Sequence, residues 1–308
     1  MLELTKVSQL PSDWPGSVVA IGKFDGIHLG HQQLIHEAVE YAQDASLAAI
    51  ALTFDRHPKA LFDPANCPKE LIGPGQKADL ISDLGVDALL VLEFDQALAS
   101  LTPEDFVSQQ LVPLRTQMVF VGEGFTFGAG GKGTVEQLRE LGQRYGFRVR
   151  EIANVLFSDH KVSSTDIRLL LEQGKVETAA HLLGRNHRVI GTVEHGRKLG
   201  RTLGFPTANI SRDADGLLPA DGVYAGWVYV GEKRYPAAHS VGTNDSIEAV
   251  PRLLESHLIG VSDIDLYGQV VTCEFVAQVR GWQKFSSLED LIQQISDDVA
   301  KATEILGE

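Results

Sequence analysis

The stretch GKFDGIHLGHQQL, residues 22–34, lies where an apolar run gives way to a helical pattern, and this transition indicates the fold of the first half of the chain. The run before it, SVVAIG (17–22), is typical of a buried strand. After it, apolar residues follow one face of a predicted helix: Leu34, Ile35, Ala38, Val39 and Ala42. A strand-to-helix turn presents backbone N–H groups and the positive end of a helix dipole, and so predicts a polyphosphate site.

Further apolar runs in the first half alternate with helical patterns: AAIALTF (48–54), DALLVLEF (87–94) and QMVFVG (117–122). One helix is predicted to begin at a capping box formed by Thr134 and Gln137 and to end at Gly146. Strands that are apolar throughout and are separated by helices are typical of a parallel sheet covered on both faces. The first half therefore predicts an α/β domain.

From Arg188 onward, glycines are frequent and the pattern becomes β-rich: RVIGTVE (188–194), GVYAGWVYV (222–230), RYPAAHSV (234–241), LLESHLIG (253–260) and QVVTCEFVAQV (269–279). In the last run, alternate residues are apolar, which predicts a one-sided strand: Val271, Cys273, Phe275, Ala277 and Val279. Several such strands predict a small antiparallel barrel. We place the domain boundary near residue 184, giving domains of residues 1–184 and 185–308.

The chain is predicted to end in a helix that closes the barrel. Ser286 and Glu289 have the spacing of a capping box at its start. Apolar residues at helical spacing predict its buried face: Leu288, Leu291, Ile292, Ile295 and Val299.

Composition excludes several classes of protein. With 308 residues, of which 44% are hydrophobic and 22% charged, the chain can form two domains with separate cores. A net charge of −14 argues against a nucleic-acid-binding surface, so an anionic ligand needs a local concentration of donors. Neither a leader sequence nor an apolar run of membrane-spanning length is evident, which predicts a cytoplasmic protein without membrane contact. Cys67 and Cys273 are far apart, so neither a disulfide nor a zinc site is expected.

The most informative motif is HLGH, residues 28–31. Two imidazoles add directed donors to the predicted turn, and Gly26 and Gly30 allow phosphates to approach the backbone closely. These features suit adenylyl transfer, in which a phosphate oxygen displaces pyrophosphate and the protein aligns the reactants and stabilises charge. The alternative is that His28 and His31 only shape the turn, but the strand-to-helix context favours a ligand site.

Several segments of the first half, in the same order, resemble the bacterial bifunctional riboflavin kinase/FAD synthetases: GKFDGIHLGHQQL, LTFDRHP (52–58), VGEGFTFGAGGKG (121–133) and VSSTDIR (162–168). The resemblance implies an α/β Rossmann-like nucleotidyltransferase domain followed by a small antiparallel β-barrel riboflavin kinase domain with a C-terminal helix. It implies a transferase that converts riboflavin to FMN, releasing ADP, and then FMN to FAD, releasing pyrophosphate. It further implies that ATP is the co-substrate and Mg²⁺ the cofactor of both steps.

The resemblance also assigns roles in the first domain. In the family, the histidines of HxGH contact ATP phosphates, so His28 and His31 are the implied catalytic residues. Further residues are implied to bind the nucleotide: Gly22, Phe24, Asp25, Gly26, Gly30, Ser164, Thr165 and Arg168. The GxxFxFG-like segment implies flavin contacts from Phe125 and Phe127.

The segment GTVEHGRKLGRTLGFPTANI, residues 191–210, resembles the riboflavin kinase signature. It implies a loop that covers the phosphates, with Gly196, Lys198 and Gly200, and it implies that Thr207 and Asn209 supply oxygens to Mg²⁺ and the nucleotide.

Glu255, which precedes DLYG (265–268), matches the family glutamate that takes the proton of the riboflavin 5′-hydroxyl. Arg280 and Trp282 are implied to lie beside the isoalloxazine ring.

Two positions depart from the family pattern. Gly124 stands where the family carries Asp or Asn, and VGTNDSI (241–247) replaces VGTNPTF. Two alternatives therefore stay open: a riboflavin kinase with weakened or lost FAD synthetase activity, and a flavin-binding regulator without catalysis. The oligomeric state does not follow from the sequence.

Overall fold

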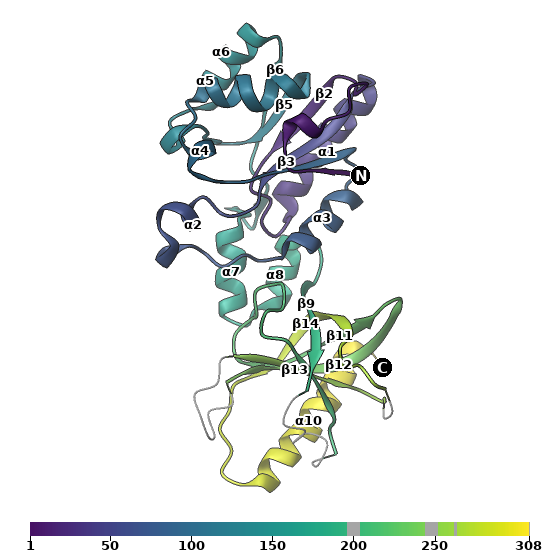
Figure 1. Ribbon diagram of the computed structural model, residues 1–308. Coiled ribbons are helices and arrows are strands. Elements are labelled where there is room, and N and C mark those ends of the chain that lie inside the picture. Colours follow the sequence, from purple (N-terminus) through teal and green to yellow (C-terminus); the bar gives the residue numbers. More distant parts are fainter. Residues whose placement is uncertain (196–203, 244–251, 262–263, 308) are drawn as a thin grey trace. The chain divides into compact units, whose positions relative to one another are not determined.

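The computed structural model describes residues 1–195, 204–243, 252–261 and 264–307 (Figure 1). Contacts divide the chain into two units. The first holds Met1–Lys69 and Pro74–Val162, and the second holds Glu70–Gly73 and Ser163–Glu308. Within the described ranges, no helix is both long enough and apolar enough to cross a membrane.

The first unit contains the following elements in chain order: β1 (Leu2–Leu4), η1 (Val7–Gln9), β2 (Ser17–Ile21), α1 (Leu29–Asp44), β3 (Ala48–Phe54), α2 (Lys59–Phe62), η2 (Pro64–Asn66), α3 (Pro74–Asp83), β4 (Ala88–Leu92), α4 (Gln96–Ala99), α5 (Pro103–Phe106), η3 (Val107–Leu111), η4 (Val112–Leu114), β5 (Thr116–Gly122), η5 (Ala129–Gly131), α6 (Val135–Tyr145), β6 (Arg148–Ile152), β7 (Leu156–Phe157) and β8 (His160–Lys161).

Six strands of the first unit form one parallel sheet in the order β1-β4-β3-β2-β5-β6. This sheet confirms the predicted α/β fold, and all four predicted strands are present as β2 to β5. The predicted face of α1 is the buried one. Helix α6 begins at Thr134, whose side chain accepts from the backbone N–H of Gln137, and ends at Gly146 in the left-handed region (φ 87°).

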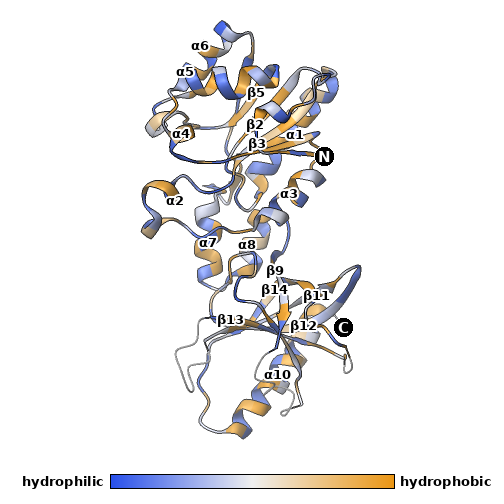
Figure 2. Ribbon diagram, viewed as in Figure 1, coloured by the Kyte–Doolittle hydropathy of each residue, from blue (hydrophilic) through white to orange (hydrophobic). Residues whose placement is uncertain are grey.

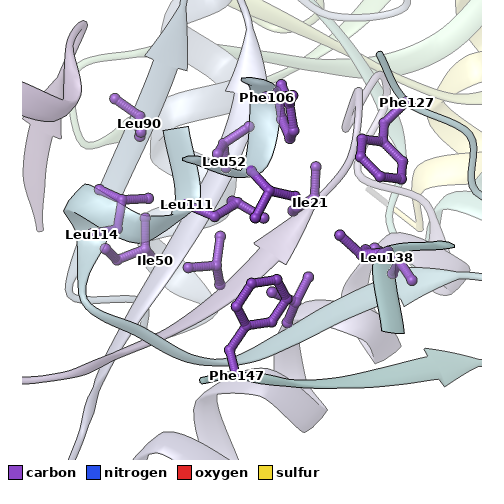
Figure 3. Close-up of a cluster of buried hydrophobic side chains, with 14 of the residues drawn as sticks. Ile21, Ile50, Leu52, Leu90, Phe106, Leu111, Leu114, Phe127, Leu138 and Phe147 are labelled. Carbon is purple, nitrogen blue, oxygen red and sulfur yellow. The ribbon is translucent and has the colours of Figure 1, made fainter. Parts of the chain in front are cut away.

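The core of the first unit lies between the sheet and the helices that cover it. Figure 3 shows Ile21, Ile50 and Leu52 from neighbouring strands converging with Phe147 and Leu138. Apolar side chains of parallel strands point to both faces of the sheet and are covered there, which explains the unbroken apolar runs in the sequence (Figure 2).

The second unit contains α7 (Ser164–Glu172), α8 (Val176–Leu183), β9 (His187–Glu194), β10 (Thr207–Ile210), β11 (Gly222–Val230), β12 (Lys233–Gly242), β13 (Leu253–Leu258), β14 (Val270–Gly281) and α10 (Leu288–Leu306). Six of its strands close into an antiparallel barrel in the order β10-β13-β12-β11-β14-β9. The barrel confirms the predicted fold class. Contacts group α7 and α8 with this barrel, whereas the domain boundary after residue 184 stays a prediction.

The predicted alternation along β14 holds only in its first half. Val271, Cys273 and Phe275 are buried, but Ala277 and Val279 are half-buried. The pairing of β14 with β11 skips one residue after Phe275 and another after Gln278, so two β-bulges reset which side chains face inward.

The end helix departs from the prediction in two ways. Its N-cap is Ser287, which accepts a hydrogen bond from the backbone N–H of Asp290, so the predicted cap at Ser286 is wrong by one residue. Its predicted buried face is also wrong, since Leu288 is 54% exposed and Ile292 is 36% exposed. Only its second half packs against the barrel, with Ala302 fully buried.

A short segment of the first half of the chain, Glu70–Gly73, belongs to the second unit. Leu71 is fully buried there, and its carbonyl accepts a hydrogen bond from the backbone N–H of Leu217 at 3.3 Å. Gly73 lies against Asp215 so closely that a Cβ atom would collide with its side chain. The second unit is therefore built from two separate pieces of chain.

Candidate active sites

The first candidate site lies at the carboxyl edge of the parallel sheet, beside the central strand β2. The chain passes from β2 to β3 on one side, whereas β5 pairs with β2 on the other side. Such a reversal is a topological switch point, and ligands of open α/β sheets bind in the crevice at the carboxyl ends of the strands there. Pairing of Ile21 with Val121 keeps the two strand ends level, so the switch point brings together the HLGH loop and the GEGFTFG loop.

The loop after β2 has an unusual backbone. Positive φ angles occur at Gly26 (82°) and at the non-glycine residues Phe24 (48°) and Ile27 (41°). A non-glycine residue in this region costs about 1–3 kcal/mol and persists only where its surroundings hold it. Phe24 and Ile27 are buried in the core, and a Cβ on Gly22 would lie 2.6 Å from the Phe24 ring. Core packing therefore fixes the loop before any ligand binds.

The two histidines lie at the start of α1. His28 is the N-cap residue, and its Nδ1 accepts a hydrogen bond from the backbone N–H of His31 at 3.4 Å. The two rings stack with their centroids 3.7 Å apart, and Phe24 meets His31 edge-on at 5.4 Å. A Cβ on Gly30 would lie 3.2 Å from His28, and Asp25 is buried in the same loop. Because Nδ1 of His28 accepts, a neutral His28 ring carries its proton on Nε2.

The pKa of His31 is held well below its usual value. Burial is the largest cause, and electrostatic interactions with His28, Lys77 and Lys161 lower it further. The ring is therefore neutral at pH 7. Its Nδ1 atom is buried and has no hydrogen-bond partner within the described residues. The loop thus offers two imidazoles and a helix N-terminus to an anion, as the predicted phosphate site requires.

The two predicted flavin contacts in the GEGFTFG loop, residues 122–128, differ in how far they are buried. Phe127 is 6% exposed, exchanges two backbone hydrogen bonds with Gly133 and packs against Phe106 at a centroid distance of 5.7 Å. Phe125 stacks on Phe127 at 5.8 Å and is half-buried. Phe127 is therefore part of the core, and Phe125 is the more accessible of the two. Gly124 has φ 74°, a left-handed backbone that strains most side chains and that Asn and Asp tolerate best, and nothing lies within 4 Å of its Cβ position, so the Asn or Asp of the family would have room there.

An aromatic cluster that the sequence did not indicate lies beyond strands β3 and β4. Phe94 contacts Phe54 at a centroid distance of 5.5 Å and Phe62 at 6.4 Å, and Phe62 is 61% exposed. The two loops are joined because Asp55 accepts hydrogen bonds from Arg56 and from the backbone N–H of Phe94. Burial raises the pKa of Asp55, but these hydrogen bonds outweigh burial and leave its pKa below the usual value. A flat apolar ligand can stack on such a surface.

The SSTDIR segment begins α7 in the second unit. Ser163 is the N-cap: its hydroxyl accepts from the backbone N–H of Asp166 at 3.2 Å and donates to the Asp166 carboxylate at 2.6 Å. Ser164 and Thr165 occupy the first turn, and Arg168 lies one turn further on. The segment thus has the helix start that the sequence predicts, and its role in nucleotide binding stays a prediction.

The second candidate site lies on the outer face of the barrel. Asn209 on β10 pairs with Glu255 on β13 and with Glu194 on β9. Thr207, two residues before Asn209 on β10, pairs with His257. Paired residues of an antiparallel sheet point to the same face with Cβ atoms about 4.5–5.5 Å apart. Because their strand neighbours are buried inside the barrel, these five side chains share the outer face.

The environment of Glu255 suits a proton acceptor, because burial raises the pKa of its carboxyl above the usual value. A higher pKa makes the carboxylate a stronger base. The residues predicted to cover the phosphates lie outside the described residues: Gly196, Lys198 and Gly200.

The two remaining flavin candidates differ in their surroundings. The Arg280 guanidinium binds the Asp298 carboxylate through Nε at 2.9 and 3.0 Å and through Nη2 at 2.8 Å, and its Nη1 donates to the Gly281 carbonyl. These contacts favour a structural role for Arg280. Trp282 is 57% exposed and lies near Gly242, so its ring is available to a ligand.

Sequence reasoning missed two residues of these sites. Phe62 lies shortly after the end of β3. A search for apolar residues near the carboxyl ends of the predicted strands would have included it. Glu194 belongs to the quoted GTVE segment, and its pairing with Asn209 follows only from the barrel register.

Both units match family models. The model described as FAD synthetase matches residues 10–166, and the model described as riboflavin kinase matches residues 183–306. A bifunctional riboflavin kinase/FMN adenylyltransferase of Escherichia coli (strain K12) is 35% identical over 303 residues, covering 98% of this chain and 96% of the relative. The enzyme of the same name from Bacillus subtilis (strain 168) is 35% identical over 291 residues, covering 93% and 91%.

Among solved structures, that of a protein named macrolide-efflux protein from Streptococcus pneumoniae has a TM-score of 0.87 and 31% identity, and the match covers 96% of each chain. That name concerns the other protein, and the likeness here is one of fold across both units. The full-length matches in sequence, together with the two family models, show that the chain belongs to the bifunctional riboflavin kinase/FMN adenylyltransferase family.

Proposed function

We propose that the chain phosphorylates riboflavin to FMN with ATP and then transfers the AMP group of a second ATP to FMN, which yields FAD and pyrophosphate. The observation that supports this best is that one chain holds both kinds of site. The first unit has an HxGH turn at the switch point of a parallel sheet, and the second has Glu255 beside Asn209 on a barrel.

In the kinase step, Glu255 is the catalytic base. Its carboxylate orients the 5′-hydroxyl of riboflavin and takes the hydroxyl proton while the oxygen bonds to the γ-phosphorus of ATP. The bond between that phosphorus and the bridging oxygen breaks, and ADP leaves. The raised pKa of Glu255 matches this task, because a proton moves more readily to a stronger base.

The residues around Glu255 fit a magnesium ion. Thr207 and Asn209 present a hydroxyl and an amide oxygen on the same outer face, and the Glu255 carboxylate lies on the adjacent strand. Neutral and anionic oxygens are the ligands that Mg²⁺ prefers, usually alongside the phosphates of the substrate. When bound, the ion would neutralise charge on the transferred phosphoryl group. Thr207 and Asn209 would hold it, and both also position the nucleotide.

In the adenylylation step, a phosphate oxygen of FMN bonds to the α-phosphorus of ATP, and pyrophosphate leaves. His28 and His31 donate to phosphate oxygens, while the N–H groups at the start of α1 stabilise their charge. We propose that Gly22, Phe24, Asp25, Gly26 and Gly30 shape this nucleotide site and that Ser164, Thr165 and Arg168 contribute to it.

For the flavin ring, we propose Phe125 and the exposed face of Phe62 in the first unit, and Trp282 in the second. Each presents an accessible aromatic surface of the kind on which a flat isoalloxazine stacks. Phe127 supports Phe125 from the core, and Arg280 supports its site through Asp298. A cytoplasmic location for the protein stays a prediction.

Chromatography of the products tests the function. Riboflavin with ATP and Mg²⁺ should yield FMN and then FAD, and FMN with ATP should yield FAD. Glu255→Gln should abolish FMN formation and leave conversion of FMN to FAD intact, whereas His31→Ala should do the reverse. No FMN from the unaltered protein would overturn the kinase assignment, and loss of both activities in either folded variant would overturn the assignment of two separate sites.

A further inference from the structure

His257 links the two halves of the kinase site in the second unit. It lies on β13 two residues after Glu255, and it pairs with Thr207 at the start of β10. Its Nδ1 atom lies 2.8 Å from the carbonyl oxygen of Pro206, the residue before Thr207. A carbonyl oxygen only accepts, so Nδ1 carries a proton and donates it in either charge state of the ring. A side chain of the strand that carries the proposed base therefore holds the backbone next to Thr207.

The start of β10 has few other anchors. Among the described residues, β9 pairs with β10 from Asn209 onward, so the ladder reaches Thr207 from β13 alone. Pro206 has no N–H group and cannot donate to a ladder, which leaves its carbonyl as the backbone group that can be held. Phe205 packs edge-on against the His257 ring at a centroid distance of 5.6 Å, and this contact restricts the rotation of the imidazole.

The three proposed ligand groups of this site differ in how their backbones are held. Asn209 is paired on both sides, with β13 and with β9. Glu255 is also paired on both sides, with β10 and with β12. Thr207 has one neighbouring strand among the described residues, so its position relies on the hydrogen bond from His257. A functional group has to be held within about 0.5 Å of its productive position, usually by neighbours that lock it there.

We propose that His257 is a positioning residue for riboflavin phosphorylation, which holds Thr207 beside Asn209 and Glu255 by binding the Pro206 carbonyl through Nδ1. This inference rests on the proposed function, because it assigns a residue to that same site. The competing explanation is that His257 acts through Nε2, directly on a substrate. Because the two nitrogens belong to one ring, substitutions that keep one of them and remove the other separate the two explanations.

Asparagine and glutamine each keep one of the two nitrogens. The amide nitrogen of Asn takes the place of Nδ1 and that of Gln takes the place of Nε2, whereas Leu supplies neither. In the full chain, His257→Gln and His257→Leu should lower kcat for riboflavin phosphorylation about 10- to 100-fold, the usual effect of removing a group that orients a metal ligand. His257→Asn should stay within about threefold of the unaltered protein, because it keeps the donor to Pro206. The KM for riboflavin should change little in all three variants. His181→Asn, at an exposed histidine of α8, is the matched control and should have no effect.

A spectroscopic measurement tests the hydrogen bond without turnover. In the unaltered protein without added metal or nucleotide, NMR of the ring nitrogens should show that the neutral His257 ring carries its proton on Nδ1. The signal is assigned by its absence from His257→Gln. A neutral ring with its proton on Nε2 would contradict the inference.

The kinetic outcomes are equally decisive. A normal His257→Gln beside an impaired His257→Asn would assign the role to Nε2 and overturn the inference, as would equal impairment of the two, or a kcat equal to that of His181→Asn in every variant. Conversion of FMN to FAD by the same variants should be unchanged, which shows that they are folded. If His257→Leu does not fold, the comparison of Asn with Gln still decides. If the unaltered protein makes no FMN from riboflavin, the proposed function fails instead, and the NMR result still tests the hydrogen bond.

Discussion

The ion pair between Arg280 and Asp298 leads to a quantitative prediction. The Asp298 carboxylate is 5% exposed, accepts from Arg280 and also accepts from Gln294 at 2.9 Å. In Arg280→Met, that carboxylate would keep only the Gln294 donor. Loss of one partner of a buried pair usually costs about 3–5 kcal/mol, because the other charge is left buried without its partner. We therefore expect the free energy of unfolding of the second unit to fall by about 3–5 kcal/mol.

Two companion variants make this prediction specific. Asp298→Asn leaves Arg280, which is 21% exposed and can be hydrated, so it should cost only about 1–2 kcal/mol. The double variant Arg280→Met with Asp298→Leu removes both charges and should lie within about 1 kcal/mol of the unaltered protein. Urea unfolding followed by the fluorescence of Trp227 and Trp282, both in the second unit, measures all three.

The same variants decide whether Arg280 contacts flavin. A structural role predicts that the double variant recovers stability and nearly normal KM for riboflavin together. If Arg280→Met lost less than about 1 kcal/mol of stability, or if the double variant kept a KM for riboflavin raised tenfold or more, Arg280 would be a flavin contact and the argument from the ion pair would fail.

Three other predictions concern two buried histidines, the two cysteines and the free space beside Gly124. Burial is the main cause that lowers the pKa of His187 and of His239 to about 4, so the unfolded chain binds protons first as pH falls through 6.5. The free energy of unfolding should then drop by about 2 kcal/mol per histidine between pH 7 and pH 5, as urea titrations at each pH will show. Burial raises the pKa of Cys273 to about 12, so in native protein iodoacetamide should modify Cys67 and spare Cys273 by mass spectrometry. Gly124→Asn should fold normally and raise the rate of FAD formation from FMN; a fall in that rate would show that glycine is required there.

Much of the first unit was predictable because its interior strands are buried on both faces. Strands β2 to β5 appear in the sequence as continuous apolar runs, which few other structures produce. The two edge strands escaped prediction. β1 has three residues, and β6 carries Arg148 and Arg150 on its solvent side, so neither shows a strong pattern.

The errors in the second unit have local causes. Ser286 and Ser287 each precede an acidic residue by three positions, so two overlapping caps compete and the sequence does not choose between them. The bulges in β14 depend on its partner strand and leave no mark in the sequence. Along α10, hydrophobic spacing predicts which face can be buried. How many turns of that face are buried depends on how far the barrel surface extends along the helix.

For the sites, residue types were predictable and contacts were not. HLGH in its strand-to-helix context indicated phosphate chemistry, and the family resemblance of PTAN implied metal and nucleotide chemistry. By contrast, three features depend on which elements become neighbours: the lack of a hydrogen-bond partner for Nδ1 of His31 among the described residues, the pairing of Glu194 with Asn209, and the ion pair of Arg280. Chain order alone does not contain that information.

The four residues Glu70–Gly73 have a consequence for synthesis on the ribosome. They emerge about ninety residues before α7, and Leu217, the hydrogen-bond partner of Leu71, is made only after β9 and β10. Residues 74–162 are therefore synthesised before Leu71 can form this contact. A protein that begins at residue 163 would lack the buried Leu71 side chain of the second unit. A peptide of residues 70–73 added in trans would supply that side chain.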